Sequence, residues 1–110
     1  MYVRVSRFEG VDSSRAETMV EEMRWQMDAM RRGETPEGIP AESVAARRDD
    51  IARGMSLLDR EHGVSLFLAF ADDEAAMGRV DAALNAMSPG EGGGGRSAVE
   101  TYEVLLDASR

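Results

Sequence analysis

Two segments of this chain place apolar residues at spacings of three and four, the spacing of one helix face. The first predicted helix, residues 13–32, follows the possible N-caps of VDSSR and ends before Gly33. The second begins at Asp72 as its N-cap. The apolar faces consist of Ala16, Met19, Val20, Met23, Met27 and Met30, and of Ala76, Met77, Val80, Ala83, Leu84 and Met87. The fold must therefore bury one face of each of two amphipathic helices.

Strand-like segments flank both helices. Side chains alternate between two faces over residues 2–8 and 97–106. Apolar residues are dense at 53–59 and 64–70, and the polar link REHG between them predicts a β-hairpin. The order strand, helix, strand, strand, helix, strand is that of the split βαβ arrangement. We therefore predict an α+β, ferredoxin-like fold: a four-stranded antiparallel sheet with the helices on one face.

The 110 residues have the usual size of one domain. Residues 33–52 interrupt the pattern before the second strand, as an inserted loop with two prolines and a short helix at ESVAARRDDIA. The glycine-rich residues 88–97 connect the second helix to the last strand. We expect serine to replace Gly92–Gly95 without loss of the fold, because loop closure depends only weakly on composition and length.

Part of this tract, GEGGGGRS at residues 90–97, has the spacing of the phosphate-binding pattern G-x-x-x-x-G-K-[ST], with Arg96 in place of lysine. Such a loop binds phosphate because backbone N–H groups converge between a strand and the start of a helix. Here the glycines follow a helix, whose C-terminal end is the negative end of its dipole. The sequence therefore favours a flexible linker over a nucleotide site.

The formal net charge of −8 disfavours nucleic acid and anionic membranes as partners, because both attract cations. The chain contains no cysteine, which excludes disulfides and thiolate chemistry. The N-terminal stretch MYVRVSRFEG has no apolar run suited to a signal peptide or a membrane span. We expect a cytoplasmic protein.

The segments YVRVSRFEG, RGMSLLDREHGVSLFLAFADDEAAM and VETYEVLL, with the methionine-rich helix after the first, resemble a known group. They are similar to the dimeric α/β-barrel superfamily that includes antibiotic-biosynthesis monooxygenase-like domains. The resemblance covers most of the chain apart from residues 33–52 and the glycine tract. It implies a homodimer in which the open sheet faces pack together. It also implies that any active site lies between the helices and the sheet of each subunit.

The haem-degrading branch of that superfamily has an asparagine near the end of the first strand, a tryptophan at the end of the third strand and a histidine on the second helix. This chain has Arg7 and Phe70 at the first two, and no histidine near Val80 for the third. Its single histidine, His62, falls in the hairpin link, so haem degradation is not expected. The acidic runs DDE and RRDD are typical of solvated helix ends rather than metal sites. We predict neither a metal nor a cofactor.

Alternation places Arg7 on the strand face of Val3 and Val5, which we expect to face the helices. A charge there needs compensation. Arg7 could reach solvent, pair with Glu22 or Asp81, or hold an anionic group of a ligand. The candidate ligand pocket consists of Arg7, Phe70, Met19, Met23 and Met77.

Two functions follow from this pocket. One is a homodimeric module that binds a small, largely apolar molecule without transforming it. The other is a cofactor-independent monooxygenase acting on an aromatic or polyketide-like substrate, with Arg7 supplying charge and Phe70 stacking. The chain contains no lysine, and no histidine is placed to activate a serine or Tyr102. The lack of a clear base favours the binding module.

Two apolar features remain. Trp25 lies off the apolar face of the first helix, where we expect the insertion to cover it; a pocket rim or a partner contact is the alternative. The stretch VSLFLAF is apolar on both strand faces, although helices cover only one. We therefore expect Tyr2, Phe8 and Phe67 to pack against a second copy.

Overall fold

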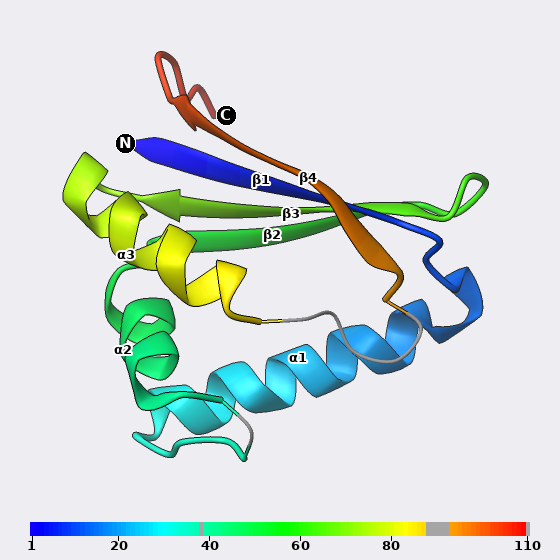
Figure 1. Ribbon diagram of the computed structural model, residues 1–110, viewed down its shortest axis with the longest axis horizontal. Helices are drawn as coiled ribbons and strands as arrows, with labels where there is room; N and C mark the ends of the chain where they lie inside the picture. Colours follow the sequence, from blue (N-terminus) through cyan, green and yellow to red (C-terminus); the bar gives the residue numbers. More distant parts are fainter. Residues whose placement is uncertain (38, 88–92, 110) are drawn as a thin grey trace.

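The computed structural model describes residues 1–37, 39–87 and 93–109. Its elements, in chain order, are β1 (Tyr2–Glu9), the one-turn 3₁₀ helix η1 (Ser13–Arg15), α1 (Ala16–Arg31), α2 (Ala41–Asp49), β2 (Arg53–Asp59), β3 (Val64–Ala71), α3 (Glu74–Asn85) and β4 (Gly95–Glu103). The sheet order is β2-β3-β1-β4, with antiparallel neighbours throughout. The helices lie on one side of the sheet (Figure 1). The fold is α+β and broadly ferredoxin-like, in agreement with the prediction.

Aspartates cap the 3₁₀ helix η1, which leads into α1, and helix α3. The carboxylate of Asp12 accepts hydrogen bonds from the hydroxyl and the backbone N–H of Ser14, and these bonds lower the pKa of Asp12. The cap of α3 is Asp73 rather than the predicted Asp72, because the Asp73 carboxylate accepts from the Ala76 N–H at 2.7 Å. Two consecutive aspartates leave the sequence unable to say which one is the cap.

The last strand is displaced toward the N-terminus from its predicted position at residues 97–106. It ends at Glu103 because Glu103 pairs with Tyr2, the first residue of β1. The next residue, Val104, still donates its N–H to the Met1 carbonyl at 2.9 Å. Because β1 begins at Tyr2, residues after Val104 have no part of β1 opposite them. Leu105 and Leu106 therefore leave the sheet, and both are more than four-fifths exposed.

The strand faces are the reverse of the prediction. Arg4 and Ser6 are buried beneath the helices, whereas Arg7 is exposed on the open face of the sheet with Val3 and Val5. The same register turns Tyr2, Phe8 and Phe67 toward the helices, so the expectation that these three pack against a second copy is wrong. Alternation defines two faces but does not say which one is covered, and a slip of one residue exchanges them.

The helices lie at different distances from the sheet. Helix α3 packs on β1 and β3 through a cluster of small and apolar side chains: Ala69, Ala71, Ala76, Met77 and Val80. Helix α1 contacts α2 and lies farther from the sheet than α3 (Figure 1). Trp25 on α1 is 64% exposed, so the insertion does not cover it as predicted. No helix among the described residues has the length and apolar character needed to cross a membrane.

One glycine of the tract is required by its surroundings. Gly94 has a φ of 72°, which side-chain-bearing residues rarely adopt, and an added Cβ would lie 2.1 Å from the carbonyl oxygen of Glu9. The expected tolerance of serine therefore fails at Gly94. At Gly95 an added Cβ meets nothing within 4 Å. Gly92 lies outside the described residues.

We predict that Gly94→Ala destabilises the protein by at least about 2 kcal/mol, because the substitution combines a backbone strain with a steric clash. Gly95→Ala is the matched control and should change stability by less than about 1 kcal/mol. Urea denaturation monitored by circular dichroism measures both. Equal midpoints for the two variants would contradict the prediction.

Candidate ligand cavity between the helices and the sheet

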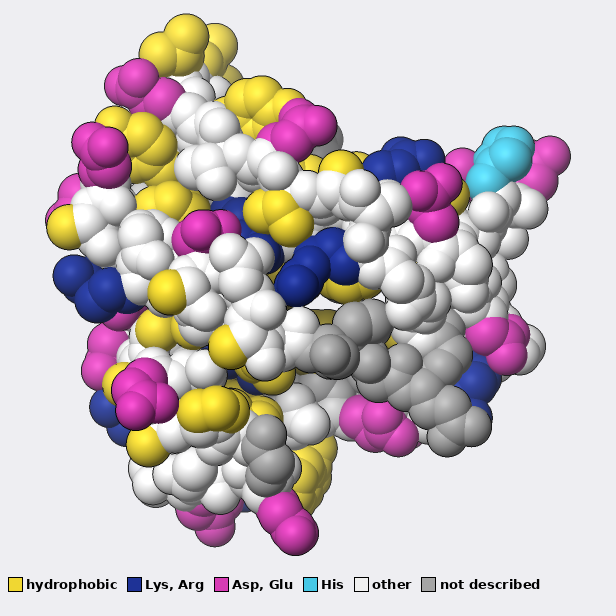
Figure 2. Space-filling view, viewed as in Figure 1, with side chains coloured by type: hydrophobic (Ala, Val, Ile, Leu, Met, Phe, Trp, Pro, Cys, Tyr) yellow, Lys and Arg dark blue, Asp and Glu magenta, His cyan; other side chains and the backbone are white. Residues whose placement is uncertain are grey.

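A cavity of about 610 Å³ lies between α1, the insertion, the end of α3 and the helix-facing side of the sheet. This volume is typical of small-molecule sites. In Figure 2, arginine atoms lie beside apolar side chains near the centre of the face shown. The apolar part of the wall includes Phe8, Met19, Met23, Ile39, Phe67, Leu84 and Met87. Polar and charged side chains, three arginines and two glutamates among them, are about as numerous in the wall as apolar ones.

The sequence creates this space by placing small side chains where larger ones would fill it. Ser56 on β2 and Ser65 on β3 both face the helices and line the cavity. Helix α1 presents Met19 and Met23 from the other side. Helix α1 packs on α2 and lies away from the sheet, so the short side chains of Ser56 and Ser65 do not fill the space beneath it. The methionine side chains of α1 are flexible and fit an irregular wall.

Arg4 lies at the cavity's sheet side and is only 1% exposed. Its Nε donates to Asp81 Oδ1 at 2.8 Å, and its two Nη atoms donate to Ser6 Oγ and Asn85 Oδ1. The guanidinium is therefore hydrogen-bonded at each nitrogen, and one carboxylate compensates its charge. Asp81 was a predicted partner for Arg7, but the arginine it pairs with is Arg4.

Arg47 contributes a second cation from α2. It lines the large cavity and also a neighbouring cavity of about 210 Å³. Its Nη1 lies 3.5 Å from the Met87 sulfur, a weak acceptor, and it forms no ion pair with a described carboxylate. Burial lowers the pKa of Arg47, because desolvation disfavours the charged form. The neighbouring Arg48 is different: it is exposed and pairs with Asp49 at 2.8 Å.

Sequence reasoning missed Arg47 because it interpreted RRDD as a solvated run. A signal was present. Arg47 follows Val44 by three residues, which places the two side chains on neighbouring parts of one helix face, and Val44 is buried.

Of the five predicted pocket residues, two line the cavity and three lie elsewhere. Met19 and Met23 line the cavity, whereas Met77 is 4% exposed within the core cluster and does not line it. Arg7 and Phe70 lie on the open face of the sheet, on the side away from the cavity. Arg7 is 47% exposed and its Nη2 lies 4.0 Å from Glu9 Oε1. The Phe70 ring lies 5.9 Å from the guanidinium carbon of Arg53.

Arg96, which occupies the lysine position of the phosphate-binding pattern, has another role. Its guanidinium donates to the carbonyl oxygens of Leu84, Asn85 and Met87. These carbonyls lie at the C-terminal end of α3, where cations are stabilised by the helix dipole. Arg96 therefore closes the end of α3 and does not point at a helix N-terminus.

His62 lies in the β2–β3 turn, with Nδ1 2.8 Å from Asp59 Oδ2, and both side chains are exposed. The hydrogen bond from His62 lowers the pKa of Asp59. Among residues 1–37, 39–87 and 93–109, no group of three or more His, Cys, Asp and Glu side chains could hold a metal ion. The turn thus forms a surface hydrogen bond and no wider cluster.

No protein-family model matches the chain, and no curated protein matches it. The similarity to monooxygenase-like domains therefore depends on the sequence segments and the ferredoxin-like topology. A fold of this kind hosts many activities, so the function must be argued from the cavity.

The Arg4–Asp81 pair generates a stability prediction. Asp81→Ala should cost about 3 kcal/mol, because it leaves a buried guanidinium without its counter-charge. Arg4→Met should cost less, because Asp81 is 43% exposed and water can solvate it. Arg60→Ala is the control; its 60% exposed side chain pairs with Glu17, which is 70% exposed, and its loss should cost less than about 1 kcal/mol. Urea denaturation gives the order, and a larger loss for Arg4→Met than for Asp81→Ala would contradict this account.

Proposed function

We propose that this protein binds a small, largely apolar molecule in the cavity between α1 and the sheet, without transforming it. The observation that carries the proposal is the cavity of about 610 Å³ with its methionine, phenylalanine and leucine wall. The two methionines of α1 adapt to different ligand shapes because their side chains are flexible and polarizable. Ser56 and Ser65 supply hydrogen bonds that orient a ligand against the sheet.

The cavity's side chains favour binding over oxygenation of an aromatic or polyketide-like substrate. That alternative depended on Arg7 and Phe70 acting inside the cavity, and both lie across the sheet from it. The described residues that line the cavity include neither histidine nor lysine, and the carboxylates in the wall, Glu22 and Glu37, are both exposed. Oxygen uptake with phenolic substrates above the protein-free rate would instead favour the monooxygenase.

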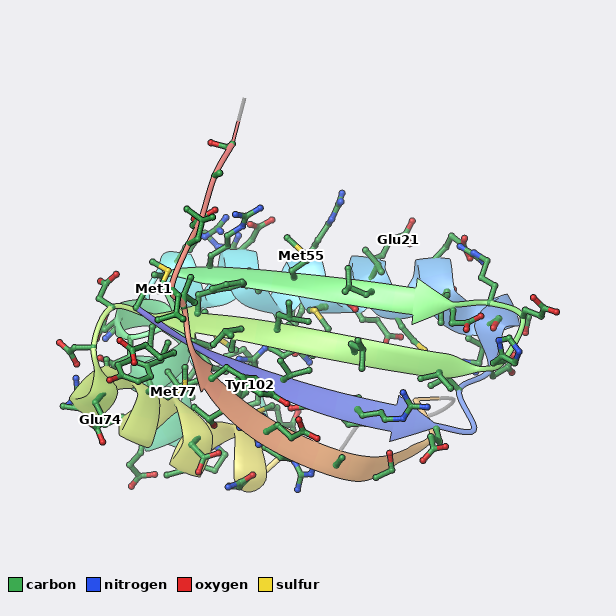
Figure 3. The ribbon with its side chains drawn as sticks, turned by 90° about the horizontal axis from the view of Figure 1, so that it is seen from above. Met1, Glu21, Met55, Glu74, Met77 and Tyr102 are labelled. Carbon is green, nitrogen blue, oxygen red and sulfur yellow. The ribbon has the colours of Figure 1, made fainter. Side chains whose placement is uncertain are left out.

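We also propose that two copies of the chain pack through their open sheet faces. Figure 3 looks onto this face, with Met55 and Tyr102 labelled on its strands. Its apolar side chains are Val3, Val5, Met55, Leu57, Leu66, Leu68, Phe70 and Tyr102. Leu57 is 41% exposed and Tyr102 51% exposed in the single chain. Covering such a continuous apolar surface stabilises an assembly by about 25 cal/mol for each Å².

The charges on the open face suit a two-fold pair. Arg53 lies at one end of β2, whereas the carboxylates of Asp59 and Glu9, with Arg7 beside Glu9, lie at the other end of this face. A two-fold axis that reverses the strand direction brings the positive end of one copy to the negative end of its partner. The exposed Leu105 and Leu106 belong to a tail that rises on the open side of the sheet (Figure 1) and adds apolar surface there.

The cavity can be tested with the uncharged fluorescent probe N-phenyl-1-naphthylamine. We expect the wild type to bind it and Ser65→Phe to bind it about ten-fold more weakly, because the new ring fills the cavity. Leu66→Phe is the matched control, since the next side chain of β3 lies on the opposite face. Fluorescence titration measures both affinities. Equal weakening by the two variants, or no binding by the wild type, would count against the proposed site.

The assembly is tested by light scattering after size exclusion. We expect a dimer at micromolar concentration for the wild type. Leu57→Glu should convert it to a monomer with an unchanged circular dichroism spectrum, because a solvated carboxylate replaces an exposed apolar contact. Val20→Glu, at a 40% exposed position on α1, should remain dimeric. A monomeric wild type, or a dimer that survives Leu57→Glu, would rule out this interface.

A further inference from the structure

We propose that the ligand of this cavity is an apolar monocarboxylic acid whose carboxylate pairs with Arg47. The inference rests on the proposed function, because it names the chemical class that the same cavity accepts. Among the described residues, three arginines line the cavity, and Arg47 is the one whose guanidinium has no oxygen acceptor.

Three arginines line the cavity, and two of them are already paired. Arg4 has Asp81, Asn85 and Ser6, and Arg96 has the carbonyls at the end of α3. Within residues 1–37, 39–87 and 93–109, the acceptor of Arg47 is the sulfur of Met87 at 3.5 Å. A partly buried guanidinium without a counter-charge is costly, and an anionic ligand group relieves that cost.

The position of Arg47 suits a ligand contact. Its side chain lines both the large cavity and the smaller one beside it, and Met23, Ser56 and Phe67 do the same. A cation at this junction can hold the polar end of a molecule whose body occupies the larger cavity. The burial that lowers the pKa of Arg47 also removes water that would otherwise screen its attraction for an anion.

The number and shape of the charges favour a carboxylate. A guanidinium donates two parallel N–H bonds to a planar carboxylate, and the single charge of Arg47 balances one negative charge. A phosphate dianion would bring a second charge into a cavity whose wall also contains the exposed carboxylates Glu22 and Glu37. The remaining wall around Phe8, Met19 and Phe67 accepts an apolar body.

Calorimetric titration with 2-naphthoate and with the uncharged 2-naphthamide tests the inference. The two probes have the same ring system, so their difference isolates the anion. We expect the wild type to bind 2-naphthoate about ten-fold more tightly than the amide, and Arg47→Gln to bind both equally. Arg48→Gln is the matched control and should keep the preference, because Arg48 is exposed and lines only the smaller cavity.

The outcomes separate the two proposals. Equal affinity of the wild type for both probes, or a preference that survives Arg47→Gln, overturns the role of Arg47 while leaving the apolar cavity intact. Tighter binding of 2-naphthyl phosphate than of 2-naphthoate overturns the carboxylate assignment. Failure of the wild type to bind the amide, the acid or N-phenyl-1-naphthylamine contradicts the proposed function itself. If Arg47→Gln does not fold, Arg47→Met and Arg47→Lys replace it: the first should lose the preference and the second should retain part of it.

Discussion

The buried guanidinium of Arg4 is the interaction on which the arrangement of this fold depends. A charge cannot remain inside a protein without partners, and two of the three partners of Arg4 come from α3, about 80 residues along the chain. Asp81 and Asn85 are separated by one helical turn, so both can reach the same side chain. Ala69 lies opposite Arg4 on β3 and leaves room for it. This network aligns α3 over β1 and decides which face of the sheet the helices cover.

That choice gives the two faces of the sheet different roles. The helix-facing side contains short and polar side chains beside the aromatic rings of Tyr2, Phe8 and Phe67, and together with α1 it lines a cavity. The open side contains most of the strands' large apolar residues, although no helix covers it. The polar side of β1 is therefore inside, where Arg4 and Ser6 are satisfied, and its apolar side is available for assembly. A ligand and a second copy would use opposite faces without competing.

The insertion gives the cavity its chemical character. Helix α2 packs against α3 and α1, and this packing places Arg47 where two cavities meet. Arg47 and Arg48 are both arginines and adjacent in the sequence, yet Arg47 is partly buried with no carboxylate partner in the part of the chain that the structure describes, whereas Arg48 is exposed beside Asp49. The difference arises from the 100° rotation between successive residues of a helix, which separates neighbours onto different faces.

The sequence by itself determined the order of the helices and strands, because periodicity, aspartate caps and turn glycines are local properties. It also placed Met19 and Met23 on a face that meets the cavity. Only the tertiary structure decided that β1 buries Arg4 and exposes Arg7, because period-two alternation is the same for either orientation. The partner of Asp81, the exposure of Trp25 and the need for Gly94 beside Glu9 likewise depend on contacts between residues distant in the chain. No local pattern encodes such contacts, since they exist only after the sheet and helices have packed.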